Sequence, residues 1–295
     1  MLSLLFFLAI STSSVIACPQ HDLNARGNIN KRASGTQDWA YEASYNWGML
    51  NQEYILCQAG TQQAPIPLLT TQGFADTHIP MFDEASYMAV PGEMFNWGYG
   101  PAFTNNASSK TGLPSMTFDN TTVYLKGLHI HSPGDHTVQG DRSKAELHLV
   151  HADAQNQEKA VMAIRIDPGN ADSKFFSQLL SGSHTGSSPA AGYATNNDTA
   201  AVSAGFSMSA VPNFDSQATL PMTLDVLEAL REVNMFSDFW TYSGSLTSPP
   251  CTEGIRFWVA SNPLYVSVRQ MQAILAVSTY SARAEQEVWL HAINR

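Results

Sequence analysis

Two pairs of residues with alternating spacing could together hold a metal ion. His129 and His131 lie two apart in LHIH, and Glu146 and His148 lie two apart in AELHLVH. Successive side chains of a β-strand point to opposite faces of its sheet, so the two members of each pair share a face. Two neighbouring strands could therefore aim three imidazoles at one point. That is the ligand set of a catalytic zinc site whose fourth position is left for water.

The carboxylate of the second pair strengthens this interpretation. A ligating histidine usually donates its other ring N–H to a carboxylate or a carbonyl, and Glu146 is placed to receive one. The alternative is that these are ordinary hydrogen-bonded histidines of a β protein. Spacing alone leaves both interpretations open.

The segments around these pairs have the signature of strands. Residues 121–131 and 144–151 alternate in polarity, and Ser-Pro-Gly-Asp between them is typical of a turn. A third apolar run covers residues 160–166, and we expect it to end at Asp167-Pro168-Gly169. Because the three segments follow closely along the chain, we predict that they are antiparallel neighbours.

The remaining pattern predicts a mainly β, α+β protein. We expect a single domain with a large central, twisted, mostly antiparallel sheet and a few short peripheral helices. An aromatic-rich, irregular arm is expected over residues 33–57, an extended edge over 62–69, helices over 173–180, 223–236 and 267–277, a loop over 182–203, and a strand over 254–260.

The N-terminus indicates a secreted protein, and the charge limits its partners. The net charge is −10 and there is no basic cluster, which argues against nucleic acid or an anionic membrane as partner. Residues 1–17 resemble a signal peptide, and residues 18–32 a pro-segment ending at the dibasic Lys31-Arg32. The mature domain would then cover residues 33–295. Alternatively, the dibasic pair is an ordinary feature of a disordered arm.

Cysteines and sequons fit secretion. Cys18 falls in the segment that would be removed, and Cys57 and Cys251 remain as a pair, for which we predict a disulfide. Sequons at Asn106, Asn120 and Asn197 are candidate glycosylation sites.

A longer motif links the chain to a known family. Residues 239–254 read FWTYSGSLTSPPCTEG, and together with HIHSPGDHTV and AELHLVH they resemble the α-class carbonic anhydrases. The resemblance extends from Trp39 to the helix expected after Ser267, so it covers nearly all of the mature domain. The secretory start and the cysteine pair are most similar to secreted members of the fungal or bacterial type.

This resemblance implies a reaction and a set of roles. The reaction is reversible hydration of CO2 to bicarbonate and a proton, with zinc bound by His129, His131 and His148 and with Glu146 orienting the third ligand. Thr247 would accept a hydrogen bond from zinc-bound hydroxide. The rest of the substrate site would consist of Ser248, Val150, Val161, Leu246 and Phe257. Core packing would also explain the four apolar residues of that set.

Some positions depart from the family pattern. Asp135 stands where the family has a glutamate that orders the threonine hydroxyl, and we expect it still to accept a hydrogen bond from Thr247. Gly127 replaces a glutamine that supports the first ligand. The histidine that relays protons in fast members is missing. Tyr99 is the nearest candidate at the rim of the site, but a phenol with a pKa of about 10 is a poor relay.

Alternatives follow from the same residues. A non-catalytic, carbonic-anhydrase-like binding protein would keep the fold after losing a zinc histidine, but all three histidines are present here. A metal-binding β-barrel of the cupin type would need a second glycine-and-histidine motif, which is missing. The resemblance is also compatible with a homodimer.

Overall fold

The computed structural model describes residues 39–105, 107, 112–180 and 219–295. The predicted signal peptide, pro-segment and 182–203 loop lie outside these ranges, as do Asn106 and Asn197. Asn120 lies inside them, in an exposed turn. Within the described ranges, no helix is both long and apolar enough to cross a membrane.

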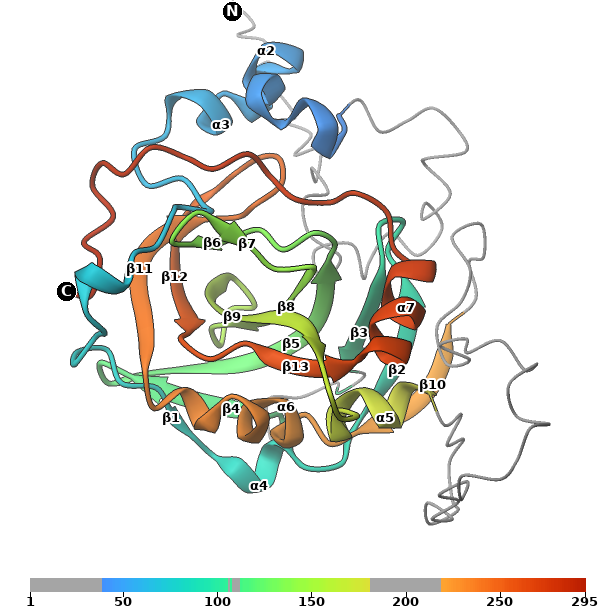
Figure 1. Cartoon of the computed structure of the whole chain (residues 1–295). Coiled ribbons are helices and arrows are strands. Elements are labelled where there is room, and N and C mark those ends of the chain that lie inside the picture. The colour runs from blue at the N-terminus through green and yellow to red at the C-terminus, as the bar shows by residue number, and fades with distance from the viewer. Residues whose placement is uncertain (1–38, 106, 108–111, 181–218) are drawn as a thin grey trace, which may run out of the picture.

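A twisted sheet of 11 strands forms the centre of the described chain (Figure 1). Its main path runs β10-β2-β3-β5-β8-β9-β12-β11. The pairs are antiparallel, except that β12 and β13 pair in parallel with β9. The strands are β1 Met81–Phe82, β2 Val90–Asn96, β3 Pro101–Asn105, β4 Ser115–Phe118, β5 Thr121–His131, β8 Ala145–Ala152, β9 Glu158–Gly169, β10 Leu220–Leu224, β11 Phe239–Ser245, β12 Glu253–Ala260 and β13 Leu264–Ser267. A separate ribbon pairs β6 Thr137–Val138 with β7 Asp141–Arg142.

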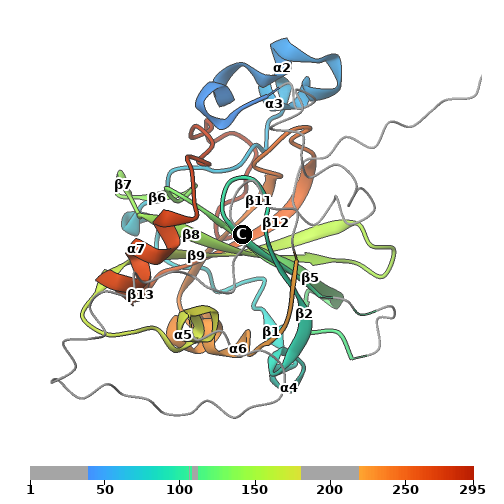
Figure 2. The same cartoon turned by 90° about the vertical axis from the view of Figure 1, so that its right-hand side faces the viewer.

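Short helices cover both faces of this sheet (Figure 2). The α-helices are α2 Trp47–Leu50, α3 Leu56–Ala59, α4 Glu84–Tyr87, α5 Lys174–Leu180, α6 Leu227–Glu232 and α7 Val268–Ala276. The 3-10 turns are η2 Tyr41–Asn46, η3 Gln52–Tyr54, η4 Thr70–Gln72 and η6 Asn234–Phe236. Helices α5, α6 and α7 pack on one face, and the arm that contains α2 and α3 lies beyond the other. The predicted fold class is therefore confirmed.

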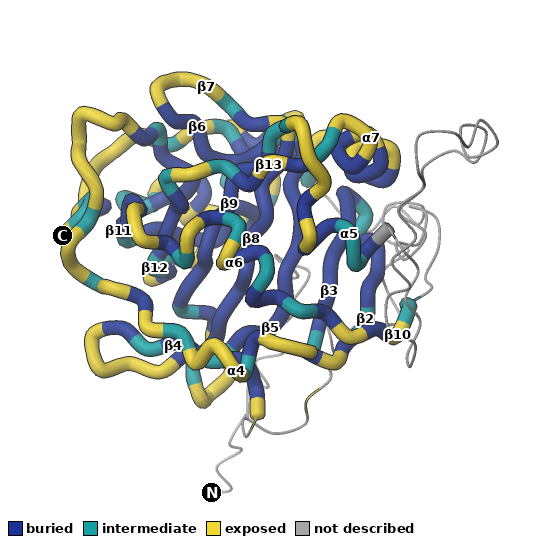
Figure 3. Tube along the Cα trace, turned by 60° about the horizontal axis from the view of Figure 1, so that its bottom comes forward, coloured by how far each residue is buried: buried dark blue, intermediate teal, exposed yellow. Residues whose placement is uncertain are grey.

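The two faces of the central strands have different neighbours. Leu147 and Leu149 of β8 face the hydrophobic core under the helices, whereas Val150 faces a second core that is shared with β9, β11 and β12. Both layers are deeply buried, so the central strands are dark in Figure 3 while most turns are not. Strand β8 is buried along its whole length, as expected for a strand covered on both faces.

A β-bulge in β5 sets the direction of the candidate ligands. Leu125 pairs with His151 and Gly127 pairs with Val150, so Lys126 is an extra residue in the ladder. Val123 and Leu125 face the helix-covered core before the bulge, and Leu128 and Ile130 face it afterwards. The change of parity turns His129 and His131 toward the opposite face.

The predicted antiparallel order β5-β8-β9 is confirmed. The predicted helix over 223–236 is wrong in its extent, because Thr223 and Leu224 pair with β2 and only Leu227–Glu232 is α-helical. Positive φ values over Asn234–Phe236 stop that helix. The strand predicted to stop at Asp167-Pro168-Gly169 continues to Gly169, because β13 pairs with it in parallel. The described part of the arm is not irregular, since it consists of short helices.

The predicted disulfide is confirmed. Cys57 in α3 is bonded to Cys251, and their Cα atoms are 5.1 Å apart. The bridge is buried with the aromatic residues Tyr41, Trp47, Tyr54 and Tyr99. It fastens the arm to the loop that follows β11.

Removing this bridge should destabilise the fold strongly. It joins residues 194 apart in sequence, so on the chain-entropy model the Cys57→Ser/Cys251→Ser variant should lose about 2–5 kcal/mol of unfolding free energy. Urea denaturation followed by circular dichroism measures this loss, and reduction of the unmodified protein should reproduce it. A double variant with an unchanged urea midpoint would contradict the assignment.

Candidate metal centre

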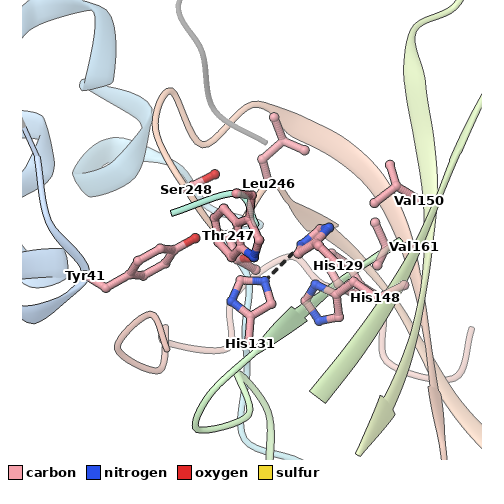
Figure 4. A pocket seen from close by; sticks show the side chains of 11 residues that line it. Tyr41, His129, His131, His148, Val150, Val161, Leu246, Thr247 and Ser248 are labelled. Carbon is pink, nitrogen blue, oxygen red and sulfur yellow. Dashed lines mark hydrogen bonds between the residues drawn. The ribbon is translucent and has the colours of Figure 1, made fainter. Parts of the chain in front are cut away.

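Three buried imidazoles converge on one side of the sheet (Figure 4). His129 pairs in register with His148, and His131 pairs with Glu146, across strands β5 and β8. The ligating nitrogens of the three rings lie within 4.8 Å of one another, and Nε2 of His129 is 3.0 Å from Nε2 of His131. Two nitrogens bound to one tetrahedral zinc at 2.0–2.1 Å would be about 3.3 Å apart. The spacing therefore suits a shared metal ion.

Partners outside the triad determine which nitrogen of two rings is free to bind a metal. His131 donates from Nδ1 to the carbonyl oxygen of Ser281 at 2.7 Å, which leaves its Nε2 with a lone pair. His148 donates from Nε2 to Oε1 of Glu146 at 2.7 Å, which leaves its Nδ1 with a lone pair. Such partners orient a ligating ring before the metal arrives.

Glu146 is the central acceptor among the hydrogen-bond partners that surround the three rings. Besides His148, its oxygens accept from His136 Nδ1 at 2.6 Å and from the His136 backbone N–H at 2.8 Å. Burial would raise the pKa of Glu146, but His136 and the hydrogen bonds from both histidines outweigh it and hold this pKa well below its usual value. His136 accepts in turn from the hydroxyl of Tyr242 at 2.7 Å. The carboxylate therefore stays ionised and fixed.

Burial also keeps two of the three candidate ligand rings neutral. It lowers the pKa of His129 well below its usual value, and the neighbouring His131 and His148 lower it further. Burial likewise lowers the pKa of His131, although Asp135 opposes the shift. A neutral imidazole is the form that binds a metal, so these two rings are ready for one at neutral pH.

The structure gathers the predicted substrate residues around this triad. A small pocket is lined by His129, His131, His148, Val150, Val161, Leu246, Thr247, Ser248, Phe257, Tyr41 and Trp97. Val150 and Val161 are cross-strand partners on β8 and β9. The cavity volume is about 20 Å³, and a single water molecule needs roughly 10–15 Å³. The pocket thus suits a very small, weakly polar molecule.

The predicted hydrogen bond between Asp135 and Thr247 is not formed. Oδ1 of Asp135 accepts from the backbone N–H of Arg283 at 2.8 Å. Oδ2 is buried without a hydrogen-bond partner in the described chain and lies 3.6 Å from Nε2 of His131. An aspartate reaches one methylene less far than the glutamate of the family, so the amide holds it short of Thr247.

Tyr99 does not reach the rim of the pocket. It is buried between Trp39, Tyr41 and Trp97, with its ring centroid 4.8 Å from those of both Tyr41 and Trp97. Trp97 rather than Tyr99 lines the pocket, and its ring centroid lies 5.3 Å from that of His129. The other predicted departure, Gly127, lies directly after the bulge in β5.

Sequence reasoning missed several residues of this centre. His136 follows Asp135 directly, and its position in the turn gave no periodic signal. Ser281 and Arg283 lie in the chain after α7, where no element was predicted. Arg283 is buried and donates to the carbonyl oxygen of Ala64 at 2.7 Å, so it ties that segment to the arm side of the site. Burial lowers its pKa to about 10, which leaves it charged at neutral pH.

Comparison with known proteins assigns this geometry to a family. The model of the eukaryotic-type carbonic anhydrase family matches residues 42–295. The chain belongs to the carbonic anhydrase family.

Individual relatives match over most of the chain, as the family model does. A carbonic anhydrase from Klebsiella pneumoniae is 31% identical over 237 residues, which are 79% of this chain and 80% of that protein. Dioscorin DB3S from Dioscorea polystachya is 29% identical over 228 residues, 77% of this chain and 71% of that protein. The solved fungal α-carbonic anhydrase from Aspergillus oryzae has the same fold, with a TM-score of 0.64 at 21% identity over 85% of this chain and 92% of its own.

The buried histidines should make the metal-free protein sensitive to acid. Unfolded histidines titrate near pH 6.5, and burial lowers the pKa of His129 and His131, and that of His151 to about 3. The unfolded state therefore binds more protons below pH 6.5, and stability is lost as the pH falls from there, by up to about 1.4 kcal/mol per pH unit for each group.

Urea unfolding of the metal-free protein at several pH values between 7.5 and 4.5 measures this slope. His129→Asn/His131→Asn should flatten the slope, while the contribution of His151 remains. A slope that is the same in the variant and the parent would contradict the assignment.

Proposed function

We propose that the chain is a zinc-dependent enzyme that reversibly hydrates CO2 to bicarbonate and a proton. The observation that carries this proposal is the triad His129, His131 and His148, buried and convergent, with the free nitrogens of His131 and His148 set by outer partners. Family membership supports the same reaction.

The donor set fits zinc better than magnesium or calcium. Three imidazole nitrogens in a mainly apolar pocket suit Zn²⁺, whereas Mg²⁺ and Ca²⁺ take oxygen ligands. Bound in this way, zinc lowers the pKa of a bound water molecule to about 7, and carbonic anhydrase is itself the standard example of this effect. The triad would hold the ion, and Glu146 would keep the ring of His148 in place.

The other residues of the pocket would place the substrate. Val150, Val161, Leu246 and Phe257 form an apolar wall that suits a linear molecule without hydrogen-bond donors. Thr247 lies next to this wall, where its hydroxyl can orient the attacking oxygen and its backbone N–H can hold a substrate oxygen. Correct placement of this kind is a large part of catalysis for so small a substrate.

The alternative of a non-catalytic binding protein needs a damaged triad. Each of the three histidines is in place, and each faces the pocket. The supporting carboxylate is also in place. We therefore favour the enzyme.

We further propose that the protein acts outside the cell. The buried disulfide between Cys57 and Cys251 fits an oxidising compartment. The signal-like start and the exposed sequon at Asn120 point the same way. Glycan analysis of protein secreted by a eukaryotic host would test both features.

Metal content and activity should follow the triad together. The purified protein should contain one zinc per chain, and dialysis against a chelator should abolish CO2 hydration, which added zinc should restore. His129→Ala should lose both the metal and at least about 10³-fold of activity, because zinc sites need their full ligand set. Elemental analysis and stopped-flow hydration assays measure the two quantities.

A matched control is His78→Ala, since His78 is paired with Asp119 away from the pocket. This variant should keep both zinc and activity. Full activity in the zinc-free parent would refute the proposal.

Proton release should depend on the buffer. Apart from the three candidate metal ligands, the described lining of the pocket contains no histidine or carboxylate, and its Tyr41 is a phenol with an ordinary pKa of about 10. Raising the imidazole buffer concentration from low to high should therefore raise kcat by about tenfold or more, with kcat/KM unchanged. Steady-state hydration rates across a buffer series test this, and a kcat that does not respond would contradict it.

A further inference from the structure

Trp97 lies against two histidines of the candidate metal centre. It lies in the hairpin loop between β2 and β3 and lines the pocket. Its ring centroid is 5.3 Å from that of His129 and 5.5 Å from that of His131, at steep angles to both. The indole therefore stands against two of the three imidazoles rather than at the outer rim.

The surrounding structure holds this indole in place. The backbone N–H of Trp97 donates to Gly100 at 3.1 Å, and the ring N–H points at the carbonyl of Ile130 at 3.4 Å. The side chain of the preceding Asn96 is anchored at 2.9 Å to the carbonyl of Val277. The rings of Tyr41 and Tyr99 pack against the indole. Trp97 is thus a fixed wall.

The indole and the apolar wall leave little space in the pocket. Tyr41, whose ring packs on the indole, stands on one side of the histidines, and Val150 and Val161 stand on the other (Figure 4). The remaining volume is about 20 Å³, whereas an apolar cavity that binds benzene measures roughly 150 Å³. Neither valine can retreat, since both belong to central strands of the sheet.

We infer that Trp97 is a specificity-determining residue that limits ligands and substrates of this centre to a few non-hydrogen atoms and excludes aromatic ones. CO2, bicarbonate and small anions pass this limit. Aromatic carboxylates and aryl esters do not, because their rings would have to occupy the space of the indole. This inference rests on the proposed metal site and narrows its substrate class.

Cobalt-loaded protein offers a readout that is independent of turnover. The visible spectrum of Co²⁺ bound to imidazoles changes when an anion joins it, so titration yields a Kd. Formate and benzoate suit the test because they present the same carboxylate and differ in the ring. In the parent protein, we expect benzoate to bind at least about tenfold more weakly than formate, the lower end of the effect of one misfit methylene in an apolar pocket.

Three variants distinguish an effect of the Trp97 ring on ligand size from a general effect on folding. Trp97→Ala should tighten benzoate binding by about tenfold or more, with the Kd for formate little changed. Trp97→Phe keeps a ring in place and should exclude benzoate as the parent does. Trp39→Ala is the matched control, since Trp39 packs on Tyr41 and Tyr99 but does not line the pocket, and it should bind as the parent does.

The outcomes distinguish this inference from the proposed function. Cobalt-loaded parent that binds benzoate as tightly as formate overturns the role of Trp97. So does a folded Trp97→Ala variant whose preference for formate is unchanged. A parent that takes up no cobalt overturns the proposed metal site, and this inference with it.

Discussion

A single extra residue in strand β5 decides which face of the sheet carries the histidines. Lys126 has no partner opposite it in the ladder to β8, so the alternation of side chains shifts by one position there. Shifting a strand by one residue exchanges its two faces. Without the bulge, His129 and His131 would point into the hydrophobic core under the helices. The side chain of Lys126 does form an ion pair, since its Nζ lies 3.2 Å from Oε1 of Glu158.

Once the histidines face the pocket, the orientation of His148 depends on Glu146, a carboxylate that is costly to bury. An ionised carboxylate inside a protein is tolerated only when its lone pairs are satisfied. Glu146 meets this condition with donors from His136 and His148, and the network continues to Tyr242 on β11. The hydrogen bonds that stabilise the buried charge are therefore the same ones that orient His148, a candidate metal ligand. Stability and function share one set of atoms at this point.

The parts predicted correctly from sequence are those with a period or a long motif. Alternation in β5 and β8 brought the three imidazoles together, and the cysteine count predicted the bridge between Cys57 and Cys251. Positions without a period could not be found this way. The bulge at Lys126 was not predicted, although the apolar positions change from odd to even numbers across it. The helical spacing after Thr223 was overridden by pairing of β10 with β2. Trp97 lies in a hairpin loop, where side-chain direction depends on the turn.

The centre departs from its family in the short reach of Asp135 and in the indole that stands against two ligands, yet the three imidazoles remain convergent. The central claim is that Nε2 of His129, Nε2 of His131 and Nδ1 of His148 bind one zinc ion. Diffraction from zinc-loaded crystals on both sides of the zinc absorption edge tests it most directly. The account predicts one anomalous peak within bonding distance of those three nitrogens. A peak bonded to Nε2 of His148, to a carboxylate oxygen of Asp135, or away from the triad would contradict it.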